Sequence, residues 1–167
     1  MKTISYRGGI VQFNIPENWV EKYDKNGGSE FYFDSQDSGT LRLNVTTLKK
    51  PKHIDISELS LVDFLKDFNS EIDPNIRQIN EKVAITQYDE SFVEQGQNLI
   101  IRFWIVANLV PPKNIRIATF SYTLLESQFN EPEFIEELKM LNKEIENCIF
   151  SEEIGVLKNR PWWRFGI

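Results

Sequence analysis

The sequence has one cysteine and one histidine in 167 residues, and each scarcity excludes a kind of chemistry. Cys148 has no second cysteine to pair with, so no disulfide can form within the chain, which fits a reducing compartment. His53 would have to serve any serine–histidine triad or zinc site alone, and it lies in a basic segment away from carboxylates and nucleophiles. We therefore expect no catalytic residue, no metal site and no cofactor.

Long apolar runs and phosphate-binding loops are also missing. The longest apolar run, residues 99–106, is interrupted by Arg102 and is far shorter than the ~20 residues that span a bilayer. The first nine residues contain no apolar core of a signal peptide. The glycine pairs at 8–9 and 27–28 lack the neighbours that a phosphate-binding loop requires. We expect a cytoplasmic protein without membrane insertion.

Basic residues are outnumbered, since the chain carries a net charge of −6. Nucleic acid is therefore not an expected partner, because phosphate binding needs clustered lysine and arginine. Residues 126–153 alone hold nine glutamates and two lysines. This segment is either a solvated helix face or an acidic surface that attracts a basic partner, for which Glu136, Glu137 and Glu144 are the candidate residues.

What the sequence does contain is a series of alternating segments. Apolar and polar residues alternate with a period of two at 11–15, 31–33 and 40–46, which is typical of strands that bury one side. The polar segment 35–39 between the last two predicts a hairpin turn. We also allow a short helical turn at 16–19.

The second half predicts a meander of longer strands. Segments 82–93, 99–108 and 115–125 are the strands, and 94–97 and 111–114 are the turns between them. The strand at 99–108 is apolar on both faces, which is typical of a central strand that is covered on both sides. We therefore expect layers on both faces of at least part of the sheet.

Two helices are predicted by apolar residues that recur with a period of 3.6. Ser60 and Asp63 form a weakened capping box before the first helix. Asn130 is the expected cap of the second, and Pro132 falls in its first turn. The apolar stripes are Leu61, Phe64, Leu65 and Phe68 in the first helix and Phe134, Leu138, Leu141, Ile145 and Cys148 in the second.

Together these segments predict an α+β fold, an antiparallel sheet sandwiched by helices. Residues 1–150 form a single domain in this interpretation, and residues 151–167 form a C-terminal aromatic tail. The tail either packs on its own domain or anchors a partner or a second subunit. Tryptophan and arginine often dominate interface energetics. The candidate anchor residues are Arg160, Trp162, Trp163, Arg164 and Phe165.

The sequence resembles the PsbP-like superfamily, which includes the Ran-binding Mog and DcrB-like proteins. The resemblance rests on a strand that runs into a Pro-x-x-Trp turn at 13–19, followed by the aromatic segment 31–33 and the hairpin strand 39–45. It covers residues 4–150 and implies an α/β/α sandwich. It implies no catalytic residues, because these families are mainly adaptors, chaperones or assembly factors, some of them chaperones of type VI secretion effectors.

Three functions remain open on the sequence. The first is a protein-binding module, such as an adaptor, a secretion chaperone or an immunity-type protein, which binds a protein partner or forms a homodimer. The second is a carrier of a small apolar ligand held between sheet and helices, which predicts a closed aromatic pocket. The third is a carboxylate-dependent enzyme, which predicts a concave site with acidic residues of separated pKa values.

Overall fold

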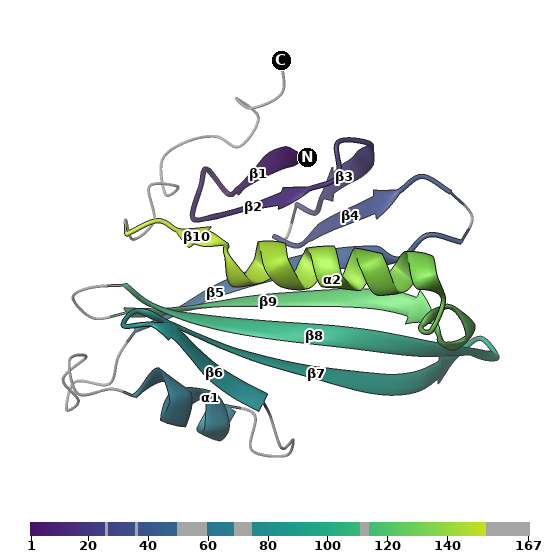
Figure 1. Cartoon of the computed structure of the whole chain (residues 1–167). Coiled ribbons are helices and arrows are strands. Elements are labelled where there is room, and N and C mark those ends of the chain that lie inside the picture. The colour runs from purple at the N-terminus through teal and green to yellow at the C-terminus, as the bar shows by residue number, and fades with distance from the viewer. Residues whose placement is uncertain (26, 36, 50–59, 69–74, 111–113, 153–167) are drawn as a thin grey trace.

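The computed structural model describes residues 1–25, 27–35, 37–49, 60–68, 75–110 and 114–152, and most of its elements are strands (Figure 1). The strands are β1 (Lys2–Tyr6), β2 (Val11–Ile15), β3 (Trp19–Tyr23), β4 (Ser29–Phe33), β5 (Thr40–Lys49), β6 (Asn75–Asn80), β7 (Val83–Glu94), β8 (Gln97–Val110), β9 (Asn114–Leu125) and β10 (Ile149–Phe150). The helices are α1 (Leu61–Phe68) and α2 (Pro132–Glu146), and a 3₁₀ turn, η2 (Glu126–Gln128), precedes α2.

Seven strands form one antiparallel sheet in the order β3-β4-β5-β9-β8-β7-β6. Its centre is the long pairing of β9 with β5 on one side and β8 on the other. The β7–β8 hairpin closes through Gln95 and Gly96, which both have positive φ, as two-residue hairpin turns require. The predicted hairpin between residues 31–33 and 40–46 is confirmed as the β4–β5 pair.

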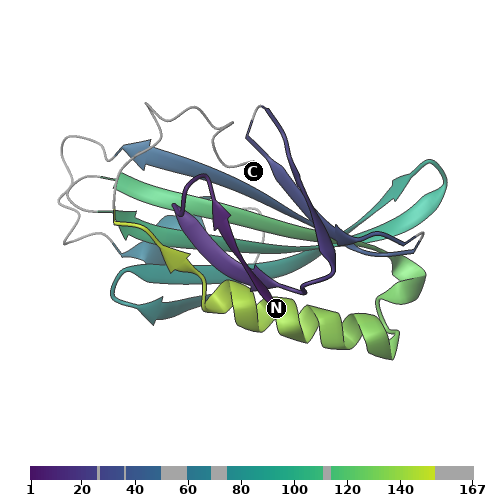
Figure 2. The same cartoon turned by 90° about the horizontal axis from the view of Figure 1, so that it is seen from above.

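A second sheet of three strands, in the order β1-β2-β10, shares one face of the large sheet with α2. Seen from above, β1 and β2 lie over the large sheet and α2 runs beside them (Figure 2). Phe13 of β2 joins the two sheets, because its ring contacts Phe31 at 5.4 Å and Phe120 at 5.2 Å, both edge to face. We call this covered side the inner face.

The opposite, outer face is covered in part by α1. Leu61 and Leu65 of the helix are buried against Ile105 and Ile117 of the sheet. The predicted cap is confirmed, since the Asp63 N–H donates to the Ser60 hydroxyl at 3.2 Å. β8 therefore has neighbours on both faces, as its two apolar sides predict.

The prediction of an α+β fold, with an antiparallel sheet sandwiched by helices, is wrong. The described part is mostly β, with two sheets and two α-helices, and a second sheet takes much of the place where a helical layer was expected. β1, β3, β6 and β10 are additional strands. They are short or lie at sheet edges, and β3 buries only Trp19, so they show little alternation. The α/β/α sandwich that the family resemblance implies is corrected in the same way.

Two smaller predictions also need correction. The segment at 16–19 is a turn into β3 rather than a helical turn, with the Trp19 N–H donating to the Pro16 carbonyl at 3.2 Å. The cap of α2 is Glu131 and not Asn130, although Pro132 is the first helical residue as expected. Neither helix in the described ranges is long and apolar enough to cross a membrane.

Thr86 on the outer face offers a test of this packing. Its hydroxyl is fully buried and has no hydrogen-bond partner among the described residues. A buried hydroxyl without a partner is destabilising, so Thr86→Val is expected to raise the free energy of unfolding by about 1 kcal/mol in urea denaturation. Thr46→Val on exposed β5 is the matched control, with an expected change near zero. Equal effects at both positions would contradict the burial argument.

Candidate functional site

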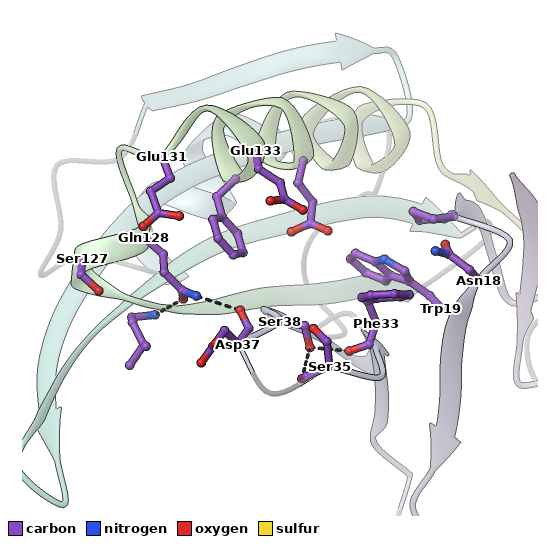
Figure 3. A pocket seen from close by; sticks show the side chains of 14 residues that line it. Asn18, Trp19, Phe33, Ser35, Asp37, Ser38, Ser127, Gln128, Glu131 and Glu133 are labelled. Carbon is purple, nitrogen blue, oxygen red and sulfur yellow. Dashed lines mark hydrogen bonds between the residues drawn. The ribbon is translucent and has the colours of Figure 1, made fainter.

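A cleft of about 770 Å³ opens at the N-terminal end of α2, and we call it the acidic aromatic cleft (Figure 3). It lies between α2, η2 and the turn that joins β4 to β5. Three aromatic residues line it, and so do four carboxylates, while lysine, arginine and histidine are absent from its described lining. These seven residues are Trp19, Phe33, Phe134, Asp37, Glu131, Glu133 and Glu137.

The aromatic wall is built by the strand ends beneath the helix. Trp19 is 4% exposed, and its ring stacks on Tyr122 with centroids 6.2 Å apart and planes inclined by 8°. Phe33, paired with Trp19 across β3 and β4, is 43% exposed and offers its ring to solvent. The wall thus combines a fixed indole with an accessible phenyl ring.

Glu137 of α2, which lines the cleft, is hydrogen-bonded to Tyr122 of β9. The Tyr122 hydroxyl donates to Oε2 of Glu137. Burial raises the pKa of the Glu137 carboxyl, the hydrogen bond from Tyr122 opposes this, and the neighbouring Glu133 raises the pKa further. Burial and the two glutamates likewise raise the pKa of Tyr122. The hydroxyl therefore stays protonated and holds the Glu137 side chain in place.

Gly39 makes room for this contact. It directly precedes β5, and a Cβ atom there would lie 2.0 Å from the Tyr122 hydroxyl and 2.2 Å from Cζ of the ring. Only glycine leaves that space, so a larger residue at position 39 would have to displace the Tyr122 hydroxyl.

The rim is tied together by side chains that bond to backbone. Gln128, 8% exposed, accepts from the Leu125 N–H at 3.0 Å through Oε1 and donates to the Asp37 carbonyl at 2.7 Å through Nε2. The Ser38 hydroxyl donates to the carbonyl of Phe33. These bonds connect η2 with the β4–β5 turn, so the two lips of the cleft are held relative to each other.

This arrangement suits a cation that carries apolar surface. The structure shows no ion pair for Asp37, Glu131, Glu133 or Glu137 within the described part of the chain. Carboxylates bind ammonium and guanidinium groups through charge-assisted hydrogen bonds, and aromatic faces attract the same cations. A lysine or arginine side chain, flanked by apolar residues, has this chemistry. A carboxyl of raised pKa such as Glu137 could alternatively act as a general acid.

The three glutamates of the predicted acidic surface have different surroundings. Glu137 lies in the cleft. Glu136 is exposed and pairs with Lys139 at 2.6 Å, and Glu144 accepts a hydrogen bond from Asn14 at 2.9 Å. The candidate anchors Arg160, Trp162, Trp163, Arg164 and Phe165, like His53, lie outside the described residues.

Most of the cleft was not predicted from the sequence. Trp19 belongs to a motif that reads as a packing device, and Asp37 lies in a polar turn where acidic side chains usually serve local hydrogen bonds. Phe33 is the last residue of a strand whose other phenylalanine, Phe31, is fully buried. The one available signal was the charge of the segment that contains Glu131, Glu133 and Glu137.

A metal site, a reactive cysteine and an apolar ligand were the other features to look for in the described residues. Within the described ranges, no group of three His, Cys, Asp or Glu side chains could hold a metal ion. Cys148 is half-buried, and burial raises the pKa of its thiol to about 12, so the thiol is protonated at neutral pH. Rings such as Phe13, Phe31 and Phe120 pack against one another between the two sheets. An apolar ligand bound between the sheets would have to displace these rings.

Among known proteins, the chain matches solved structures but no sequence family. No protein-family model and no curated protein sequence matches the chain. A crystal structure from Bacteroides thetaiotaomicron VPI-5482 matches 91% of this chain and 49% of its own, with a TM-score of 0.60 and 19% identity. LpqN of Mycobacterium tuberculosis, involved in cell envelope biogenesis, matches over 84% and 83%, with a TM-score of 0.58 and 11% identity. The chain thus spans about half the length of the first relative, and these identities show a shared fold only.

Proposed function

We propose that this chain is a protein-binding module, such as an adaptor, a secretion chaperone or an immunity-type protein, that acts in the cytoplasm without a catalytic site. Its acidic aromatic cleft receives a basic segment of the partner. The observation that carries the proposal is the lining of the cleft, in which four carboxylates accompany three aromatic residues and no lysine, arginine or histidine occurs among the described lining residues.

Electrostatics favour this function over a carrier of an apolar ligand. The carboxylates would repel the carboxylate of a fatty acid and the phosphate of an anionic lipid, while they would attract lysine and arginine and accelerate their association. Gln128 ties η2 to the β4–β5 turn at the rim of the cleft, which suits a peptide segment that binds between them. Preorganised walls reduce the entropic cost of binding.

The test is a charge reversal at the mouth of the cleft. Glu131 and Glu133 are exposed, so Glu131→Lys/Glu133→Lys changes the charge of the cleft without removing buried contacts. A partner is identified by cross-linking in the native host and then purified. We expect the double reversal to weaken its binding in calorimetry by about tenfold or more, since each reversal removes an attraction and adds a repulsion.

A matched control carries the same change of charge elsewhere. Glu90→Lys/Glu94→Lys alters two exposed carboxylates of β7 that do not line the cleft and should leave the affinity within about twofold at physiological salt, because salt screens exposed charges that a ligand does not contact. The proposal fails if both pairs weaken binding equally or if neither does. Because the reversals at α2 oppose the helix dipole, unfolding of each variant is measured as well.

A further inference from the structure

This inference rests on the proposed function and names one ligand of the same site. We infer that the acidic aromatic cleft binds residues 160–165 of a second copy of this chain. The segment reads Arg-Pro-Trp-Trp-Arg-Phe and lies outside the described residues. The occupant is identified by its sequence and by the shape and charge of the cleft.

The charges of the two partners are complementary. Residues 156–167 contain one lysine and two arginines and no acidic side chain. The cleft contributes Asp37, Glu131, Glu133 and Glu137, and no cation lies among its described lining residues. Arginine can pair with two carboxylate oxygens at once through its planar fork, which gives both energy and orientation.

The apolar parts are complementary as well. Residues 160–165 contain two tryptophans and one phenylalanine, and Arg164 lies between Trp163 and Phe165. The cleft exposes the ring of Phe33 and is closed behind it by Trp19 and Phe134. Aromatic rings pack edge to face or offset, and a guanidinium stacks on such rings. An acidic site without rings would bind any cation, whereas this cleft also selects the aromatic neighbours.

The position where the described chain ends favours a second copy over the same molecule. Ser151 accepts a hydrogen bond from Arg116 at 2.7 Å, and Glu152 pairs with Lys82 at 2.6 Å, which fixes this end beside the C-terminal end of α2 (Figure 1). The cleft lies at the other end of a helix of 15 residues, about 22 Å long. Residues 153–160 reach at most about 28 Å when fully extended. Arg160 could therefore reach its own cleft only along a nearly straight path, whereas a second molecule has no such constraint.

The experiment uses the full chain, a chain ending at residue 155 and a synthetic peptide of residues 156–167. We expect the full chain to self-associate in sedimentation equilibrium and the shortened chain to be monomeric. The peptide should bind the shortened chain in calorimetry and dissociate the assembly of the full chain. Binding should weaken by about tenfold when Glu131→Lys/Glu133→Lys is present, or when the peptide carries Arg160→Glu and Arg164→Glu. A Trp162→Ala/Trp163→Ala peptide should also bind more weakly.

Three results would overturn the inference. One is a peptide that fails to bind the shortened chain. Another is peptide binding that the Glu131→Lys/Glu133→Lys variant leaves unchanged. The third is a full chain that stays monomeric and excludes the peptide while the shortened chain binds it, which would place the segment in its own cleft. In each of these cases the proposed function would still hold if a different protein binds the chain and the Glu131→Lys/Glu133→Lys variant weakens that binding. Failure of this inference can therefore be distinguished from failure of the proposed function.

Discussion

Replacing Arg116 with leucine is expected to lower the free energy of unfolding by about 3–5 kcal/mol, a large part of the stability of a domain this size. Arg116 lies on the inner face of β9 and is 1% exposed. Its Nη1 donates to the carbonyl of Ile10 at 3.1 Å and to that of Ser151 at 2.7 Å. Leucine would remove both bonds: among the described residues the Ile10 carbonyl would keep only the Ser151 N–H as a donor, at 3.2 Å, and the Ser151 carbonyl would lose its bond to the guanidinium. A buried acceptor that loses its partner costs about 1–3 kcal/mol, and loss of the packed Arg116 side chain adds to this.

The measurement is urea denaturation followed by circular dichroism, with Arg42→Leu as the matched control. Arg42 on β5 is half-exposed and pairs with Glu30 at 3.2 Å, so its loss should cost less than about 1 kcal/mol. Losses of similar size for the two variants would show that Arg116 does not act as a buried link. Because Ile10 and Ser151 flank the small sheet, hydrogen exchange should rise first in β10 in the Arg116→Leu chain.

Arg116 also shows what the alternation of residues can and cannot predict. The pattern of β9 assigns Ala118, Phe120 and Tyr122 to one buried face, and Arg116 shares that face by parity. Charge alone would have placed its side chain in solvent. The carbonyls that it binds come from distant parts of the chain, and no local pattern indicates them.

Local periodicity predicted the elements that carry most of the core. Both predicted helices are present, and the strands from β7 to β9 are those of the predicted meander. Of the predicted apolar stripes, Phe68 of α1 is exposed and Cys148 lies beyond the end of α2, while the other members are buried or partly buried. In each of these segments apolar residues recur on one face over most of a helix or over at least part of a strand. β1 has Ile4 and Tyr6 as its only buried residues, and two such positions do not establish a period. The second sheet was missed for this reason, and with it the fold class.

The candidate site depends even more on long-range register. Glu137 was expected on an acidic surface because nine glutamates lie close together in the sequence. Trp19, Phe33 and Asp37 come from about 100 residues earlier, and they reach α2 only because β5 pairs with β9. Since that pairing is set by the whole sheet, the sequence predicted the charge of the cleft but not its aromatic wall.

Gly39→Ala is expected to destabilise the chain by about 2–3 kcal/mol, because the new methyl group would overlap the end of the Tyr122 side chain. Tyr122 cannot easily yield, since its ring is 1% exposed, stacks on Trp19 and donates to Glu137. Gly28→Ala is the matched control, because a Cβ there meets no atom within 4 Å. That substitution should be neutral or slightly stabilising, since alanine restricts the unfolded chain.

A double-mutant cycle separates this steric cause from an effect of alanine itself. The atoms nearest to a Cβ at Gly39 all belong to the far end of Tyr122, and the shorter side chain of Tyr122→Leu lacks them. In that background Gly39→Ala should cost less than about 0.5 kcal/mol, which gives a coupling of about 2 kcal/mol between the two positions. Equal costs in both backgrounds would contradict the overlap. If the overlap is real, Gly39→Ala should also weaken ligand binding in the acidic aromatic cleft, because displacing Tyr122 releases the hydrogen bond that positions Glu137.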